Sequence, residues 1–466
     1  MRTHRSCAAT PRLTRPRARP GQQQRARGAR GGDAASADKA RGVRRGRARR
    51  GLTPPVSAPQ RAARAAYYAR GSFYGRPASV VVYDVCVAVC REGCEGHAPL
   101  WLAIVGLTDQ LDHGRLTPDA YAAAVVELSR RVADAPGADA PRDRPLHPDG
   151  GPLVSAFHRR RIGCAQELRL SLLRHWSLLE ALVHAPAPAA ALQPWKREGA
   201  RAAEALLAEA GLPLHACRQK FSHMRPELAR AAVEALPRVA AARLGLSDLL
   251  FWSFTRQHGH CVDLSASDAV AGVGALLEAE GGGFGAAVDA LGDGGWASLR
   301  AGIDRAKRCH AAVLATCGAA LLQKGCVNAG AFRFLSLCSG GVAPAQHHAQ
   351  LLRHPAAATR LALFVQGALC AHAAKPRKPL VVALPAQGGE HPGADGSDAA
   401  AGMVLVVGVT CPPQLGDAGG NPFALAFRAA AEAVRAPFVH DAFDAAVIQL
   451  GGAHLGAFLE ELRVTM

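Results

Sequence analysis

Two stretches near the end of the chain decide that the fold is mixed: KPLVVAL at Lys378–Leu384 and MVLVVGVTC at Met403–Cys411. Both are short, rich in aliphatic residues and bounded by turn-forming residues, which is the pattern of buried strands. We expect a helix over Asn421–Ala436, a further strand over Ala445–Leu450 and a last helix over Leu455–Leu462. Strand, helix and strand in succession predict a small α/β unit.

Upstream of this unit, apolar residues recur at helical spacings of three and four through the middle of the chain. Ser265, Ser267 and Asp268 form a ready N-terminal cap for one of these helices. The pattern predicts a large helical domain without the fixed period of a solenoid. Its predicted helices are Cys164–Val183, Arg197–Ala210, Pro226–Leu244, Ser265–Glu280, Ala297–Lys324 and Ala345–Ala374.

A second pair of strands is expected before the helical domain. Ser79–Cys90 (SVVVYDVCVAVC) is rich in β-branched residues, and Leu100–Leu107 (LWLAIVGL) is its expected partner. Thr117–Val132 then has the pattern of a helix, with Thr117 as its N-cap. One arrangement consistent with the pattern pairs these strands with the C-terminal ones in a single sheet, which would make the helical domain an insertion.

The predicted fold class is therefore mixed α/β and mostly α. Its parts are a disordered basic N-terminal arm (1–66), an aromatic and basic hinge with a small strand-containing region (67–133), a loop (134–152), a large helical domain (153–376) and a C-terminal α/β unit (377–466).

The net charge of +18 is concentrated at the N-terminus. Residues 1–70 hold 19 basic and two acidic residues, a net charge of +17. The first 66 residues lack an apolar period, so burial cannot offset the entropy of ordering them, and we expect disorder. Arginine far outnumbers lysine in the whole chain, which is typical of GC-rich codon usage, but that bias does not explain the clustering.

Clustered arginines next to tyrosines are typical of polyanion binding, because the guanidinium groups release counterions and the rings stack on bases. Three alternatives are a nuclear import signal, a solubilising tail, and tyrosines that only dock the arm onto the folded body. The predicted nucleic-acid-binding residues are Arg27, Arg30, Arg41, Arg44, Arg45, Arg47, Arg49, Arg50, Tyr67, Tyr68 and Tyr74.

Thiols and imidazoles supply one candidate zinc set: Cys86, Cys90, Cys94 and His97. Structural zinc sites usually carry CxxC knuckles, and none occurs in this sequence. On a strand, Cys86 and Cys90 would lie about 13 Å apart, too far for one ion. Buried reduced thiols are therefore the main alternative, and redox chemistry is another; no other cofactor is expected.

Two weaker histidine-containing groups lie further along the chain. The first is His258, His260 and Cys261, with Cys309 and His310 in a following helix, and the second is the His347–His348 pair. Phosphate-binding loops, nucleophile elbows and zinc-protease helices are absent from the sequence. No uncharged apolar run reaches the length of a membrane span. These absences predict that the chain is not an enzyme and does not span a membrane.

Three segments carry a resemblance to a known family: Val81–Cys86, Leu100–Val105 and Leu153–Ser155. Together with the Arg-rich arm, the chain resembles a GC-rich herpesvirus protein of virion or tegument type, and locally the herpesvirus triplex capsid protein. The resemblance implies a non-enzymatic role in capsid or tegument assembly. It also implies other virion proteins as partners in a hetero-oligomer, and a location in the host nucleus and virion, with the cytosol as an alternative.

Two other function classes remain open from the residues. An RNA-binding post-transcriptional regulator in the infected-cell nucleus would use the same arm to bind RNA. An organelle-imported enzyme would carry the arm as an Arg-rich transit peptide. In all but the last class, the arm contacts nucleic acid or an acidic partner.

Overall fold

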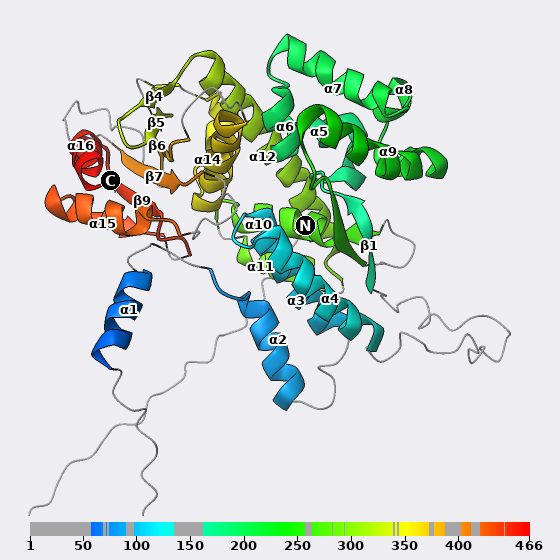
Figure 1. The fold of residues 1–466 in the computed structure, drawn as a ribbon, viewed down its shortest axis with the longest axis horizontal. Helices are drawn as coiled ribbons and strands as arrows, with labels where there is room; N and C mark the ends of the chain where they lie inside the picture. The colour runs from blue at the N-terminus through cyan, green and yellow to red at the C-terminus, as the bar shows by residue number, and fades with distance from the viewer. Residues whose placement is uncertain are drawn as a thin grey trace, which may run out of the picture. The chain divides into compact units, whose positions relative to one another are not determined.

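The computed structural model describes residues 57–68, 71, 74–89, 97–134, 162–256, 263–281, 283–292, 294–338, 341–342, 344–371, 377–386, 402–411, 420–441 and 443–466. The chain divides into two units, residues 1–57 and 58–466, and every element below belongs to the second (Figure 1). Helices outnumber strands, which confirms the mixed, mostly α fold class. Among the described residues, no helix combines the length and the apolar character needed to cross a membrane.

Four helices open this unit: α1 (Ala58–Tyr68), α2 (Ala78–Val89), α3 (His97–Asp112) and α4 (Pro118–Asp134). The central one is α3, which packs against α2, α4 and the later helix α10 (Ala266–Leu277). Its buried leucines and isoleucine recur every three or four residues, as a helix with one buried face requires. Before α4, the Thr117 hydroxyl accepts a hydrogen bond from the Ala120 amide (3.3 Å), as predicted for an N-cap.

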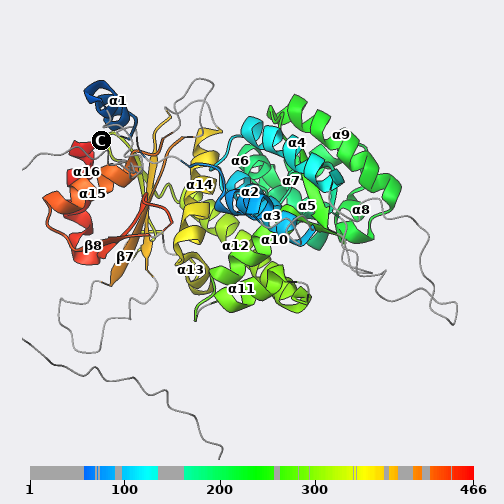
Figure 2. The same cartoon turned by 90° about the horizontal axis from the view of Figure 1, so that it is seen from below.

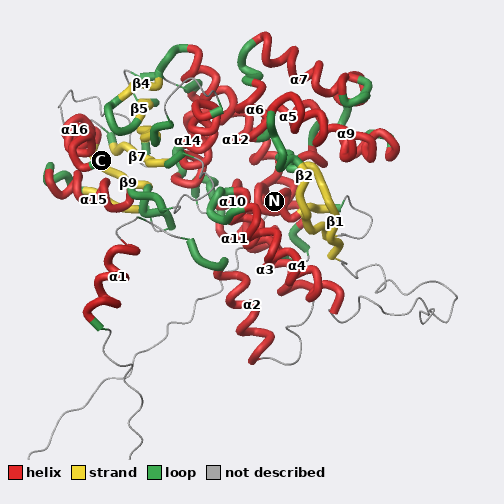
Figure 3. The backbone as a smooth tube through the Cα atoms, viewed as in Figure 1, coloured by secondary structure: helices red, strands yellow, loops and turns green. Residues whose placement is uncertain are grey.

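The predicted strands at Ser79–Cys90 and Leu100–Leu107 are wrong, because both segments are helical (Figure 3). In α2 only Val80 and Tyr83 are buried, and they lie one helical turn apart. A run of valines favours a strand, but the preference is weak and tertiary packing overrides it. Within its described residues, the 67–133 region contains no strand.

A small antiparallel sheet lies inside the region predicted to be helical. It has the order β1-β2-β3, from β1 (Ile162–Leu168), β2 (Leu250–Arg256) and β3 (Leu264–Ser265). The register pairs Ile162 with Arg256 and Leu168 with Leu250. The predicted helix at Cys164–Val183 is therefore wrong in its first half. Since β1 pairs with a strand more than 80 residues away, local periodicity does not predict the pairing.

Five helices fill the connection between β1 and β2: α5 (Leu178–His184), α6 (Pro186–Leu192), α7 (Arg197–Glu209), α8 (Leu214–Cys217) and α9 (Pro226–Leu244). Short 3₁₀ turns at Leu173–His175 and Phe221–His223 complete it. The predicted helices at Arg197–Ala210 and Pro226–Leu244 are confirmed. Their apolar periods and the prolines that precede or begin their first turns gave the signal.

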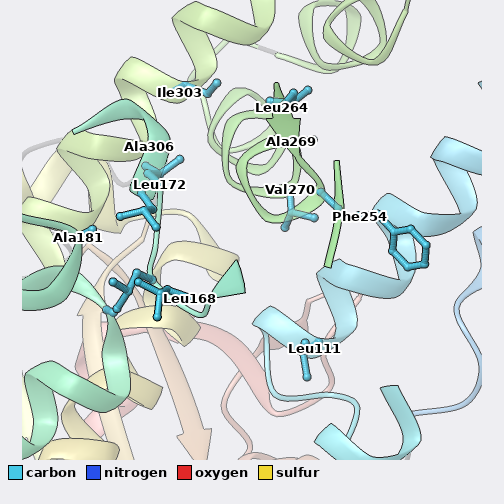
Figure 4. Packing of buried hydrophobic residues seen from close by; sticks show 14 of the residues in the cluster. Leu111, Leu168, Leu172, Ala181, Phe254, Leu264, Ala269, Val270, Ile303 and Ala306 are labelled. Atoms are coloured by element: carbon cyan, nitrogen blue, oxygen red, sulfur yellow. The ribbon is translucent and has the colours of Figure 1, made fainter. Parts of the chain in front are cut away.

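The largest core surrounds α10, which packs along the long helix α12 (Trp296–Leu322) and against α11 (Phe284–Leu291). Figure 4 shows Phe254 of β2, Leu264 of β3 and Val270 of α10 in this cluster. Helices α10 and α12 approach so closely that a Cβ atom on Gly302 would collide with the carbonyl oxygen of Gly272. Glycine at position 302 therefore permits this close packing. The predicted helices over Ser265–Glu280 and Ala297–Lys324 are confirmed, with small shifts at their ends.

The predicted helix at Ala345–Ala374 is two helices, α13 (Gln346–Leu352) and α14 (Pro355–Cys370). Proline at the first position of α14 explains the break, because the residue before a proline avoids helical dihedral angles. His354 has extended dihedrals there, and its Nδ1 accepts a hydrogen bond from the Ala356 amide.

A six-stranded sheet ends the chain, in the order β4-β5-β6-β7-β9-β8. Its strands are β4 (Cys326–Asn328), β5 (Arg333–Ser336), β6 (Leu380–Pro385), β7 (Met403–Val409), β8 (Phe438–His440) and β9 (Val447–Gly451). Only β5 and β6 pair in parallel. The strands predicted over Lys378–Leu384, Met403–Cys411 and Ala445–Leu450 are confirmed. They do not pair with residues 79–107, since their neighbours are β4 and β5, which the sequence pattern missed.

Helices cover both faces of this sheet. Leu380, Val382 and Leu384 of β6 face α14, whereas Val381 and Ala383 face the other side. There α15 (Phe423–Ala433) and α16 (Leu455–Thr465) cover the sheet on the side opposite α14 (Figure 2). The two helices contact each other through the rings of Phe427 and Phe458. Side chains of a strand alternate between faces, so a continuous apolar run such as β6 fits a strand buried on both sides.

Candidate functional site

The arginines predicted to bind nucleic acid, Arg27 to Arg50, lie outside the described residues. Tyr67 and Tyr68 fall in the last turn of α1, and their side chains are likewise outside the described part. The nucleic-acid-binding arm therefore stays a prediction.

Tyr74 is the predicted aromatic residue whose side chain the structure places. The Arg115 guanidinium lies over its ring, 5.5 Å from the centroid. Burial raises the pKa of the Tyr74 hydroxyl, and the nearby carboxylate of Asp444 raises it further. The residue still keeps 40% of its surface exposed. This contact joins the segment before α2 to the folded body, as the docking alternative expects, and leaves part of the ring accessible.

The predicted zinc ligands are divided between described and undescribed segments. Cys86 lies on α2 and His97 begins α3, whereas Cys90 and Cys94 lie between them, outside the described residues. In the part of the chain that the structure describes, no three His, Cys, Asp or Glu side chains are grouped closely enough to hold a metal ion. The four-residue zinc set stays a prediction.

An ion-pair cluster surrounds Asp84, a residue that the sequence analysis placed on a strand. Arg76 and Arg131 each donate to one of its carboxylate oxygens at 2.7 Å. Burial acts to raise the pKa of Asp84, but the hydrogen bonds and charges of the two arginines lower it overall. Arg131 also pairs with Glu127 and lies over the Tyr83 ring, 5.4 Å from its centroid. The cluster fixes α2 against α4.

A second cluster lies at the start of α10. Asp268 is 2% exposed, its amide donates to the Ser265 hydroxyl at 3.0 Å, and its carboxylate lies 3.3 Å from His175 Nε2. Arg174 lies 4.0 Å from the same carboxylate and 2.8 Å from Glu167. Burial acts to raise the pKa of Asp268, yet the imidazole and the guanidinium hold it below its ordinary value.

A third cluster lies at the end of α10. The Glu278 side chain is 2% exposed and pairs with Arg360 of α14. Arg305 of α12 donates to the Glu278 carbonyl oxygen at 3.2 Å. Beside this pair, burial raises the pKa of the Cys309 thiol. The cluster therefore links three helices, and through α14 it connects the helical core to the C-terminal sheet.

Four further titratable groups in the described part of the chain have pKa values shifted by burial toward their neutral forms. Burial raises the pKa of the thiols of Cys217, Cys309 and Cys338. Burial lowers the pKa of His310 to about 3, so its imidazole is neutral at physiological pH. A reactive thiol needs a lowered pKa, so these thiols are structural.

Most of these buried charges were not predicted from the sequence. Asp268 was noted only as part of a helix cap, and Glu278 and Arg360 were not singled out. The available signal was a charged residue inside an apolar helical run, as at Arg360 in PAAATRLALFVQGALC. Such a residue must either reach solvent or find a partner, because an unpaired buried charge is costly.

The fold resembles that of a solved structure, the crystal structure of CDC45 from Entamoeba histolytica. The TM-score is 0.62 at 18% sequence identity, over 85% of this chain and 73% of that one. The CDC45 family model matches residues 13–283 and 280–465, which together make up nearly the whole chain. The chain therefore belongs to the CDC45 family.

Curated relatives agree with this assignment. The cell division control protein 45 homolog of Dictyostelium discoideum is 24% identical over 422 residues, and that of Mus musculus is 28% identical over 406. The homolog of Schizosaccharomyces pombe is 33% identical over 214 residues. This chain covers 62% of the Dictyostelium protein, 66% of the mouse protein and 32% of the fission yeast protein. It thus matches no more than two thirds of these relatives.

The family assignment corrects the viral interpretation. The resemblance to herpesvirus capsid and tegument proteins is wrong, and so are virion proteins as partners, a virion location, the RNA regulator and the imported enzyme. The error has a physical source: base composition and an Arg-rich arm recur in unrelated proteins, and two of the matching segments, Val81–Cys86 and Leu100–Val105, lie in helices and not in strands. The third, Leu153–Ser155, lies outside the described residues. The prediction that the chain is not an enzyme is confirmed by its membership of the CDC45 family.

Proposed function

We propose that this chain acts in DNA replication as a non-catalytic component of the CMG helicase, with MCM and GINS as its partners in the nucleus. The family match over residues 13–283 and 280–465 carries this proposal. The fold likeness to the Entamoeba protein, which covers 85% of this chain, supports it. The proposal concerns the part of the factor that this sequence matches, which is 62% of the Dictyostelium relative and 66% of the mouse relative.

The buried clusters support a role as a scaffold. Each of them ties together elements that are distant in sequence, for example α10 with α14 through Glu278 and Arg360. A protein that holds larger partners in register benefits from such links, because they couple the helical core to the sheet. The raised pKa values of its buried thiols fit the same role.

The arm has a separate proposed role. We propose that the clustered arginines between Arg27 and Arg50 contact the phosphates of nucleic acid with little sequence preference. Their clustering supports this, and the contact would weaken with salt, because each neutralised duplex phosphate adds about 0.9 to the salt slope. A chain lacking residues 1–56 should then bind DNA with a shallower salt slope. An unchanged slope would contradict the role of the arm.

The test of the helicase role is co-purification from nuclei in S phase. A tagged chain should recover MCM and GINS, and recovery should survive nuclease treatment, because protein contacts rather than shared DNA would hold the assembly. The variant without residues 1–56 should recover the same partners, since its folded unit is intact. Recovery of neither partner by a folded nuclear chain would contradict the proposal.

A further inference from the structure

A pocket of about 550 Å³ lies where α12, α13 and the turn after α10 meet. Figure 2 shows α13 beside α12 at this place. Its lining is Ala279, Glu280, Arg305, Arg308, Ala311, His347, His348, Gln350 and Leu351. A volume in this range suits a small polar group together with the chain that carries it. None of the clusters at Asp84, Asp268 or Glu278 has its carboxylate in this lining.

Two guanidinium groups on one face of α12 dominate the charge of the pocket. Arg305 and Arg308 are three residues apart, so they lie on successive turns of the same face. Arg308 is exposed and makes no ion pair or hydrogen bond within the described part of the chain. Arg305 is anchored by its bond to the Glu278 carbonyl oxygen, and its Nε atom is buried without a partner. A buried donor without an acceptor is costly, so an incoming anion would relieve it.

The opposite wall carries two adjacent histidines. The His347 and His348 rings lie 4.0 Å apart, centroid to centroid. Burial lowers the pKa of His348, and the neighbouring His347 lowers it further. Arg305 and Arg308 face the pair from α12, and Glu280 faces it from the turn after α10. A ring N–H of either imidazole can donate a hydrogen bond to an anion in the pocket.

We propose that this pocket binds a phosphate monoester, the phosphorylated serine or threonine side chain of a partner protein. Guanidinium groups bind phosphate oxygens in pairs, with geometry that a lysine does not reproduce. The cations converge on one pocket instead of forming a row, which favours one dianionic group over a strand of phosphodiesters. Glu280 at the same pocket repels a second phosphate and offers a partner to a basic residue beside the phosphorylated one. This site is independent of the proposed helicase role.

The test measures binding of O-phospho-L-serine to the full chain by titration calorimetry, with serine, inorganic phosphate and an oligothymidylate as comparison probes. Phosphoserine should bind, and serine should not. Arg308→Gln should weaken phosphoserine binding about tenfold, the size expected for losing one charge-assisted hydrogen bond. Arg300→Gln is the matched control, because Arg300 is an exposed arginine of α12 outside the pocket. It should bind like the unaltered chain.

A variant that binds phosphoserine more tightly distinguishes an effect on the pocket from an effect of misfolding. Glu280→Gln removes the carboxylate of the pocket and should tighten phosphoserine binding several-fold, which a damaged fold would not do. Three results would overturn the proposal: no phosphoserine binding, equal binding by Arg308→Gln and Arg300→Gln, or inorganic phosphate binding as tightly as phosphoserine. If only the oligothymidylate depends on Arg308, the surface contacts nucleic acid and the phosphoprotein assignment is wrong.

Discussion

Both ends of α10 hold a buried carboxylate, but the helix itself stabilises the charge at only one of them. Each end carries a buried carboxylate, Asp268 in the first turn and Glu278 just after the last, and each is 2–3% exposed. Free amides and the positive end of the helix dipole favour Asp268, whereas free carbonyls and the negative end disfavour Glu278. The position of a buried charge on a helix therefore decides how much it depends on other elements.

The partners of the two carboxylates reflect this difference. Asp268 has a serine cap beside it, a histidine at 3.3 Å and an arginine at 4.0 Å. Glu278 has Arg360 on its carboxylate and Arg305 on its carbonyl oxygen. Two cations thus offset a helix end that repels a carboxylate. We infer that the C-terminal end of α10 relies on the link to α14 more than the N-terminal end relies on the segment around His175.

Removing the cation at the C-terminal end should have the largest effect. Arg360→Met leaves Glu278 buried without its ion pair, and we expect a loss of about 3 kcal/mol in the free energy of unfolding. Urea denaturation followed by circular dichroism measures it. Arg300→Met, an exposed change on α12, is the control and should leave the midpoint within error.

A double substitution tests whether the loss comes from the stranded carboxylate. Glu278→Leu combined with Arg360→Met removes both charges, and most of the stability should return, because an apolar pair avoids the cost of burying ions. If the double variant is as unstable as the sum of the two single variants, the two side chains are not coupled. The comparison between the helix ends would then fail.

At the N-terminal end, Asp268→Asn should cost about 2 kcal/mol near neutral pH, because the charge-assisted contacts with His175 and Arg174 are lost. The pKa of Asp268 is held below its ordinary value of 3.8 in the folded state. Its contribution is therefore full above pH 4 and is lost as pH falls through the lower folded pKa. Unfolding measured between pH 7 and pH 2.5 should show the two proteins converging at the acid end. A constant difference would mean that the carboxylate charge does not contribute.

The start of α5 shows what a helix N-terminus contributes without a strong ion pair. The Ser177 hydroxyl accepts from the Glu180 amide at 3.1 Å, and Glu180 accepts from the Ser177 amide at 2.8 Å. Ser177→Ala should cost about 1 kcal/mol, the usual value for losing a cap. Ser222→Ala, an exposed serine that makes no cap, is the matched control. A loss as large as that of Asp268→Asn would show that capping, not charge, dominates at both N-termini.

The sequence predicted the end of the chain well because the relevant signals are local there. β6 and β7 are short apolar runs bounded by turn-forming residues, and α15 and α16 have clear amphipathic periods. β4 and β5 were not predicted, because they are only three and four residues long and follow the 27-residue helix α12. Strands of this length leave too few alternations to be read.

The N-terminal strands failed for a different reason. Taken alone, Leu100–Leu107 is a continuous apolar run typical of a buried strand, but Leu111 continues the same buried face at a spacing of four. Extending the window by one turn would have indicated a helix, because a strand shows a period of two. At β2 no strand was predicted, and its burial pattern explains why: Trp252 is exposed, whereas its neighbours Ser253 and Phe254 are both buried, so a period of two is missing.

The candidate site was harder to predict than the fold, since its residues meet only after folding. Arg360 and Glu278 are 82 residues apart, and Arg305 lies between them in sequence on a third helix. No spacing rule connects three such residues. A single charged residue within an apolar helical run indicates that a partner exists. Only the packing of α10, α12 and α14 identifies that partner.

The smallest effect is expected where a short ion pair is exposed. Arg218 Nη2 lies 2.6 Å from Glu204, shorter than the contacts of Asp268, but the side chains are 59% and 36% exposed. Water solvates both charges when the pair breaks, so Arg218→Ala should change the free energy of unfolding by less than about 0.5 kcal/mol, and by less still in 0.5 M salt. Urea denaturation at two salt concentrations measures this. A loss above 1 kcal/mol would mean that contact distance outweighs burial, and then the ranking of Glu278 above Asp268 would lose its basis, because that ranking assumes that desolvation and the helix end set the energy.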